Sequence, residues 1–397
     1  MKSAAAWSLQ THATPHTIDA IAWDALLAAS PEPTPFLRHA WLAALHDSGS
    51  AVPQAGWTPR FVTLHAEGEA TPQAACALYL KSHSYGEYVF DWAWAEAFER
   101  AGQPYYPKLL GAVPFTPVPG SRLLATNDDA RSALAAGITQ LAQQMELSSA
   151  HLLFTDHADR TALLQAGWLE RSTVQFHWTN HDAARSATSG EPAPYADFED
   201  FLASLTRDKR RKIGQERRNV LAAGVSFEAR QGTAITETDW DFFYACYSAT
   251  YRAHHSTPYL KRDFFARIGA ELPEHCLLFI AERGGQRIAS SLVVIDPATG
   301  VAWGRYWGAL EYVSCLHFEA CYYQPLAWCI AHGYRRFEGG AQGEHKMARG
   351  LLPVRARSLH WLSHPAFFDA VARYLEREGT GIGEYVNELE QRSPFKA

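Results

Sequence analysis

The sequence predicts an α/β protein built from two similar halves. Segments with helical periodicity alternate with short apolar segments typical of strands, and the order helix–helix–hairpin–strand–helix–strand–helix–strand occurs twice along the 397 residues. Between the halves, residues 179–197 have no periodicity and are rich in Ala, Ser, Pro and Gly, which is typical of a linker. We therefore expect a tandem duplication of one α/β domain, with domains at 1–180 and 197–397.

In the first half, proline and glycine mark where the periodic segments end. The first helix stops before Pro31, since proline cannot continue a helix, and Gly167 suits the end of the last one. Helices are expected at 18–29, 37–45, 92–100, 129–146 and 160–166, and strands at 60–65, 73–81, 109–115, 151–154 and 174–178.

The second half opens with a basic segment, residues 207–219, that contains seven lysines and arginines. Such a segment suits a solvated helix, with contact to phosphate groups as the alternative. Gly284 and Gly285 predict a hairpin turn, and Pro325 predicts a kink or restart in a later helix. Helices are further expected at 239–251, 261–270 and 366–378, and strands at 276–282, 287–295, 301–309, 336–338 and 358–362.

Composition excludes several classes of protein. The formal net charge of −6 argues against a general nucleic-acid binder. The six cysteines form no C-x-x-C pair, which favours free thiols in a reducing compartment. The first residues do not resemble a signal peptide, and no run of about 18 apolar residues is present to span a membrane. We expect a cytoplasmic protein.

A glycine-rich segment, FEGGAQGEHKMARG at 337–350, fits neither helix nor strand periodicity. Its glycines allow a ligand to approach the backbone closely. Glu344, His345 and Lys346 place an acid, a titratable imidazole and a cation on consecutive residues, and Lys346 and Arg349 can hold an anion. The segment is therefore a candidate active-site turn, against the alternative of a solvated charged loop.

A second polar cluster lies at the start of the helix that contains Pro325. This helix and the glycine-rich turn follow neighbouring strands, which we expect to part at their carboxyl ends, so both clusters should open onto one gap. The residues expected to line one cleft are His317, Glu319, Glu344, His345, Lys346 and Arg349, with Tyr306, Tyr322, Tyr323, Gln342 and Arg349 as substrate-binding residues.

Three long blocks, residues 86–124, 305–330 and 338–362, resemble the signature blocks of a bacterial family. It is the FemAB-like, or peptidoglycan biosynthesis/recognition, family of the N-acetyltransferase (GNAT) superfamily. The resemblance implies tandem GNAT-like domains with mixed central sheets, and transfer of an acyl or aminoacyl group to an amine. It also implies an acceptor that is a small molecule or a lipid or cell-wall precursor.

The resemblance also bears on the donor. Characterised Fem transferases use aminoacyl-tRNA and carry an essential lysine in an F-K pair; Lys346 falls at a similar place, but His345 replaces the aromatic residue. No long coiled-coil pair follows the basic segment, so tRNA is not favoured and acyl-CoA is the expected donor. Its pyrophosphate is expected near residues 310–317, although the usual CoA signature is not plainly present and residues 118–122 are its nearest equivalent.

For an acyltransferase, the residues suggest Glu344 or His345 as the base, assisted by His317 and Glu319. Lys346→Ala is expected to abolish turnover with little loss of folding, since a loop lysine should not support a core. One alternative is a metal site formed by His317, Glu319, Glu344 and His345, although no metal is expected. Others are a cysteine nucleophile at Cys315 or Cys321, and a non-catalytic module that recognises a cell-wall or lipid headgroup.

Overall fold

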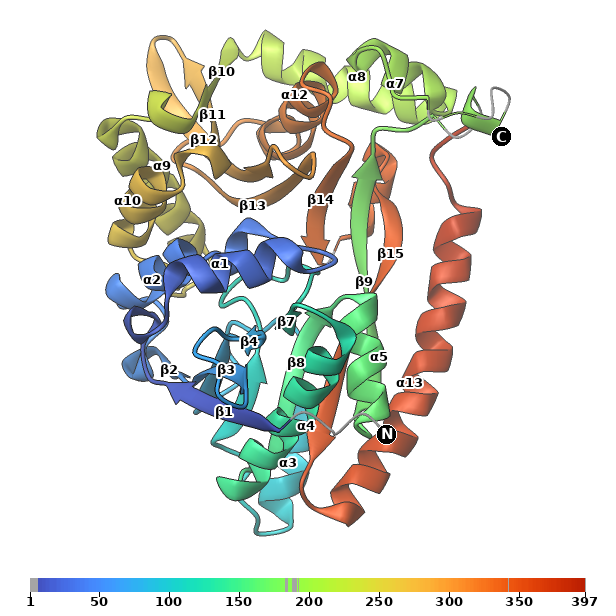
Figure 1. Cartoon of the computed structure of the whole chain (residues 1–397). Coiled ribbons are helices and arrows are strands. Elements are labelled where there is room, and N and C mark those ends of the chain that lie inside the picture. Colours follow the sequence, from blue (N-terminus) through green and yellow to red (C-terminus); the bar gives the residue numbers. More distant parts are fainter. Residues whose placement is uncertain (1–5, 183–184, 188–190, 192, 342, 397) are drawn as a thin grey trace. The chain divides into compact units, whose positions relative to one another are not determined.

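The computed structural model describes residues 6–182, 185–187, 191, 193–341 and 343–396, and the chain forms two compact units (Figure 1). The first unit comprises Met1–Thr173 and Arg355–Glu384, and the second comprises Val174–Val354 and Tyr385–Ala397. The units thus differ from the predicted ranges 1–180 and 197–397 in that Arg355–Glu384 packs with the first unit. That residues 1–180 and 197–397 fold as independent domains remains a prediction.

The first unit contains two sheets. Four strands pair antiparallel in the order β1-β3-β4-β7, and a second set follows the order β15-β8-β6-β5-β2, in which β6 and β8 are parallel. The strands are β1 Trp7–His12, β2 Trp57–Pro59, β3 Phe61–Ala66, β4 Ala74–Cys76, β5 Leu78–Lys81, β6 Lys108–Gly111, β7 Leu124–Ala125, β8 Ser149–Thr155 and the first residues of β9 Leu169–Thr179, with most of β15 Leu352–Leu362. The helices are α1 Ala20–Ala29, α2 His39–Asp47, α3 Trp92–Arg100, α4 Asp128–Gln144, α5 His157–Gln165 and most of α13 Pro365–Gln391.

Helix α4 organises the core of the first unit. Its first turn is capped by Asn127, whose side chain accepts a hydrogen bond from the Ala130 amide. The apolar face that includes Leu134 and Ile138 is fully buried in a cluster with strand residues such as Leu152 and Leu359. Because Leu359 lies in β15, the C-terminal segment is part of this core, which explains why it packs with the first unit.

The second unit contains one mixed sheet among its described residues, in the order β10-β11-β12-β13-β14-β9. The strands are β10 Val225–Gln231, β11 Cys276–Arg283, β12 Gln286–Asp296, β13 Val301–Ala309 and β14 Arg336–Ala341, with the end of β9. The longer helices are α7 Phe198–Ser204, α8 Arg207–Ala222, α9 Glu237–Ala253, α10 Arg262–Glu271 and α12 Gln324–Ala331. The predicted hairpin at Gly284 and Gly285 is confirmed, since Arg283 pairs with Gln286.

Strands β13 and β14 are parallel, but their pairing covers only part of their length. It runs from Val301 opposite Arg336 to Trp303 opposite Glu338, whereas β13 continues to Ala309. The next residue of β13 is Gly304, and a Cβ there would lie 2.7 Å from the ring of Phe337. Only glycine admits this ring, which lies where the two strands begin to part.

The chain between β13 and β14 is an irregular helix. Leu316–Phe318 forms a short α-helical turn (α11), Glu319–Tyr323 forms a π-helix, and α12 follows with Pro325 near its start. Proline supplies no N–H and clashes with the preceding turn, so a regular α-helix cannot run through this point. π-helical turns of this kind occur often at functional sites.

The structure also differs from several predicted elements. The expected strand at 73–81 is interrupted at Ala77, so β4 and β5 belong to different sheets, and the strands β1 and β10 were not predicted. The predicted linker lies between the end of β9 and the start of α7, and its residues 183–184, 188–190 and 192 lie outside the described residues. No helix in the described part of the chain is long and apolar enough to cross a membrane.

Candidate active site

A cavity of about 140 Å³ lies where β13 and β14 part in the second unit. It is bounded by the two strands, by the π-helix and by the turn after β14. The residues that line it are Ser291, Leu292, Val293, Gly304, Arg305, Tyr306, Trp307, His317, Cys321, Tyr322, Phe337, Gly339 and Lys346. Four of the predicted site residues, Tyr306, His317, Tyr322 and Lys346, therefore meet at one cavity.

Lys346 enters this cavity from the 3₁₀ helix Glu344–Arg349. The residue is only 5% exposed, and its Nζ donates hydrogen bonds to the carbonyl oxygens of Gly339 at 2.7 Å and Gly340 at 3.3 Å. A Cβ on Gly339 would lie 3.3 Å from the Lys346 side chain and 2.6 Å from Leu351, so the close passage of the lysine depends on that glycine. Lys346 is therefore a buried, anchored group and not a solvated loop lysine.

The electrostatic surroundings make Lys346 easier to deprotonate. Burial, together with the nearby Arg305 guanidinium, lowers the pKa of Lys346 to about 8. Arg305 itself donates hydrogen bonds to the carbonyl oxygens of Gly304 and Glu338. Sequence reasoning missed Arg305, and the sign that could have found it is a charged residue inside an otherwise apolar and aromatic strand.

Two imidazoles lie near the lysine, of which His317 lines the cavity, whereas His345 is exposed and is not among the lining residues. The ring centroid of His317 lies 5.1 Å from that of Trp307, 5.7 Å from that of Tyr322 and 6.5 Å from that of His345. Burial and the positive charges of Arg349 and Lys346 lower the pKa of His345, and burial with neighbouring His345 lowers the pKa of His317 to about 4. Both rings are thus neutral at pH 7, and the Tyr322 hydroxyl lies 3.3 Å from Nε2 of His345.

Glu344 points away from this cavity. Its Oε1 accepts a hydrogen bond of 2.8 Å from the Tyr385 hydroxyl, and Oε2 lies 3.5 Å from Arg392. The residue is exposed. We expected Glu344 beside His345 in one cleft, but successive residues of a 3₁₀ helix point in three directions, and Lys346 takes the inward one.

Glu319 also lies apart from His317. Its Oε1 accepts hydrogen bonds from Gln324 at 2.7 Å and from Nε of Arg217 at 3.3 Å, and burial raises the pKa of this carboxyl. It lines a different, larger cavity along α8. Residues two apart on a helix face different sides, which separates Glu319 from His317.

Arg349 and Tyr323 serve a buried polar network. Nη2 of Arg349 donates to both carboxylate oxygens of Glu216, at 3.0 and 2.8 Å, and the Tyr323 hydroxyl donates to the same carboxylate. The guanidinium also stacks 3.5 Å above the Phe318 ring centre. Through these contacts Arg349 fastens the 3₁₀ turn Glu344–Arg349 to α8, whereas the sequence predicted that it binds substrate.

Glu216 was not predicted, although the sequence carries a sign of it. It lies on the buried side of α8 with Ile213 and Val220, at three- and four-residue spacing within a basic helix. Gln342, a predicted substrate-binding residue, lies outside the described residues.

The alternative chemistries find less support in this geometry. In the described part of the chain, no three His, Cys, Asp or Glu side chains are arranged to hold a metal ion. Cys321 lines the cavity, but burial raises the pKa of its thiol, which disfavours the thiolate that a nucleophile requires.

The parted parallel strands, with an irregular helix between them, define a mixed α/β protein with GNAT-like units, which confirms the predicted fold class. The chain belongs to the FemAB-like family, described as peptidoglycan biosynthesis/recognition, whose family model matches residues 14–397. This confirms the family that the sequence blocks resembled. No functionally curated protein matches the chain.

Several solved structures are similar to this chain at low sequence identity, and the first two named here share its fold. The structure of L-PGS from Bacillus licheniformis is 11% identical, with a TM-score of 0.51, over 90% of this chain and 97% of that chain. A conserved protein of unknown function from Bacteroides thetaiotaomicron is 9% identical, with a TM-score of 0.52, over 90% and 100%. A tandem GNAT protein from the clavulanic acid biosynthesis pathway is 13% identical, with a TM-score of 0.46, over 91% and 99%.

Proposed function

We propose that the protein is an N-acyltransferase that moves an acyl or aminoacyl group from an activated donor to an amine. The observation that carries the proposal is the cavity between the parted strands β13 and β14, which is lined by a buried lysine with a pKa of about 8 and by the neutral imidazole of His317. The exposed imidazole of His345 contacts this cavity through the Tyr322 hydroxyl. Membership of a family of peptidoglycan biosynthesis proteins supports it. We propose that the acceptor amine belongs to a cell-wall or lipid precursor, and the family description supports the cell-wall precursor.

The reaction needs a group that takes a proton and a group that stabilises negative charge. The amine nitrogen forms a bond to the donor carbonyl carbon, the bond from that carbon to the thiol or hydroxyl leaving group breaks, and the amine gives up a proton. His345 is the better base, because the pKa of His317 is about 4. Lys346 is mostly protonated at neutral pH and can donate to the oxyanion.

We propose acyl-CoA as the donor, with aminoacyl-tRNA as the alternative. The 140 Å³ cavity suits a short acyl or aminoacyl group. A second cavity of about 390 Å³ is lined by Trp307 and by residues 309–313 and 315–318. It shares Trp307 and His317 with the first cavity and offers room for a longer part of the donor. This is also where we expected the donor pyrophosphate. We place the activity in the cytoplasm, where both donors occur.

The test is an assay of thiol release from acetyl-CoA with a panel of amines, including aminosugars and cell-wall peptide precursors, with product masses measured. Lys346→Met should reduce turnover at least about a hundredfold, and Tyr322→Phe, a milder change at the same cavity, should reduce it less. Lys212→Met, an exposed lysine on α8, is the matched control and should retain activity.

The outcomes separate the alternatives. Turnover with aminoacyl-tRNA but not with acyl-CoA would replace the donor and keep the transferase. Saturable binding of an amine-bearing precursor without turnover by either donor would identify a recognition module. Full activity of a folded Lys346→Met protein would refute the role of this lysine.

A further inference from the structure

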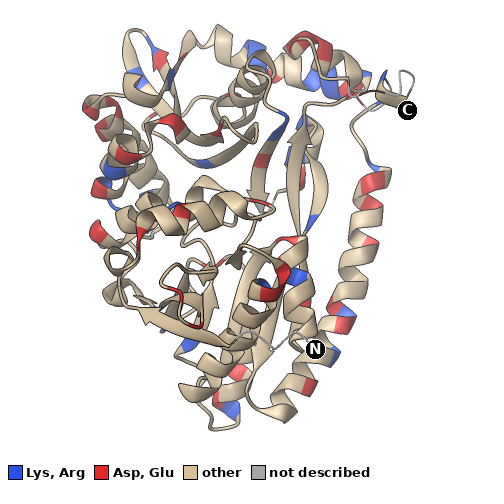
Figure 2. Cartoon of the chain, in the orientation of Figure 1, with Lys and Arg blue, Asp and Glu red and all other residues tan. Residues whose placement is uncertain are grey.

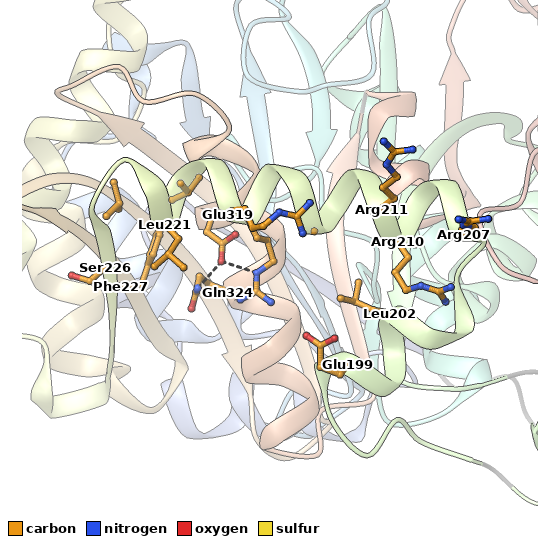
Figure 3. Close-up of a pocket in the computed structure, with 15 residues that line it drawn as sticks. Glu199, Leu202, Arg207, Arg210, Arg211, Leu221, Ser226, Phe227, Glu319 and Gln324 are labelled. Carbon is orange, nitrogen blue, oxygen red and sulfur yellow. Dashed lines mark hydrogen bonds and ion pairs between the residues drawn. The ribbon is translucent and has the colours of Figure 1, made fainter.

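A third and larger cavity, of about 710 Å³, runs along α8 in the second unit. Five arginines line it: Arg207, Arg210, Arg211, Arg217 and Arg218, of which Figure 3 labels the first three. Arg210 and Arg211 follow Arg207 by three and four residues, and Arg217 and Arg218 follow this pair by seven, which places all five on one side of the helix. From Arg207 to Arg218 the row extends about 16 Å, at about 1.5 Å per residue.

This positive charge is only partly balanced. The carboxylates that line the cavity are Glu199 and Glu319, and Glu319 is bonded by Arg217. Arg210 makes long contacts to backbone carbonyl oxygens, and Arg218 donates to a glutamine. Within the described residues, Arg207 and Arg211 have no ion-pair partner.

The chain as a whole carries a net charge of −6, so the clustering of positive charge along α8 does not follow from the overall composition. Figure 2 shows Lys and Arg gathered along α8. A cavity whose charge is left uncompensated by its own walls favours an anion with more than one negative charge.

The base of the cavity holds a buried carboxyl group. The Glu319 side chain is 5% exposed and lies beside Gln324 (Figure 3), and its Oε2 has no hydrogen-bond partner among the described residues. A buried carboxylate oxygen without a donor is costly. Burial accordingly raises the pKa of this carboxyl, which lessens the negative charge at the base of the cavity.

Shape and chemistry together indicate the kind of ligand. A volume of 710 Å³ is that of a small-molecule site, for which the usual range is about 300–1,000 Å³. Arginine guanidinium groups bind phosphate oxygens through paired hydrogen bonds. We propose that this cavity binds a small diphosphate-bearing molecule. The proposal stands whether or not the 140 Å³ cavity performs acyl transfer.

The test is calorimetric titration of the full chain with inorganic pyrophosphate. The double variant Arg207→Gln/Arg211→Gln should weaken binding at least about tenfold, since it removes two charges that face the ligand. The control is Lys209→Gln/Lys212→Gln, which removes two charges from the same helix at residues that do not line the cavity. The control should keep its affinity within about twofold, since screened charges outside the cavity contribute little.

A second probe identifies the source of the diphosphate. Phosphatidylcholine vesicles that contain a polyprenyl diphosphate are compared with vesicles of phosphatidylcholine alone. Binding of pyrophosphate only would indicate a soluble ligand, and binding of both probes would indicate a lipid headgroup; either supports the site. Three results would overturn it: no saturable pyrophosphate binding, equal loss in both double variants, or binding of RNA or vesicles without binding of pyrophosphate.

Discussion

Replacing Arg349 with methionine should destabilise the second unit. The guanidinium is 2% exposed, donates to both carboxylate oxygens of Glu216 at 3.0 and 2.8 Å, and donates from Nη1 to the His345 carbonyl oxygen at 2.7 Å. Methionine keeps much of the length but removes the charge. Glu216 would then keep a buried negative charge, with the Tyr323 hydroxyl still donating to it.

The magnitude follows from the burial of this pair. Removing one partner of a buried ion pair costs about 3–5 kcal/mol, because the other charge is left uncompensated. Urea unfolding followed by tryptophan fluorescence should show a loss of free energy of unfolding in this range. Because His345 is attached to the same turn, activity should fall as well.

A matched double variant separates structure from substrate binding. In Glu216→Gln/Arg349→Met both charges are gone, so about 1–3 kcal/mol of the loss should be recovered relative to Arg349→Met. If Arg349→Met instead unfolds within about 1 kcal/mol of the wild type and raises only the substrate KM, Arg349 holds a substrate anion and our interpretation of the ion pair is wrong.

The remaining predictions concern titration, the base and the basic helix. The pKa of Lys346 is about 8 in the folded protein against the usual 10.5, so between these pH values the unfolded chain binds more protons than the folded one. The free energy of unfolding of the wild type, relative to that of Lys346→Met, should therefore rise by up to about 1.4 kcal/mol per pH unit above pH 8. If urea unfolding shows a difference that does not change with pH, the burial of this ammonium is contradicted. Glu344→Gln should change kcat less than about twofold, whereas His345→Gln should lower it at least about a hundredfold; the reverse order in steady-state kinetics would make Glu344 the base. Gly214→Ala should stabilise α8 by about 0.5–1 kcal/mol, because the added Cβ meets only the end of the Arg218 side chain, at 3.3 Å; a lower midpoint of thermal unfolding would show that the glycine is required.

Much of the local structure could be read from residue patterns. Apolar periodicity and the glycine pair predicted the β11–β12 hairpin, and proline predicted an interruption of the helix before β14. The long blocks predicted the family, which the match to residues 14–397 confirms. The expectation that strands β13 and β14 part at one end located the cavity and four of its lining residues.

The predicted cluster failed where neighbouring residues were assumed to face one way. His317 and Glu319 are two residues apart on a helix, and Glu344 and Lys346 are two apart on a 3₁₀ turn, so in each pair only one side chain enters the cavity. The helical periodicity that identified the elements could have revealed the first separation. The separation of Glu344 from Lys346 could be recognised only from the structure, which shows that the turn is a 3₁₀ helix.

By itself, the sequence determined the family, the α/β class and the chemical groups available for catalysis, since these depend on residue type and local spacing. The tertiary structure decided which charges are compensated. Arg349 and Glu216 are 133 residues apart in the chain and form one buried ion pair. The pKa of Lys346 is about 8 because burial and the guanidinium of Arg305, which lies on β13, disfavour its charge. Burial and pairing arise from contacts between distant segments, which no local pattern specifies.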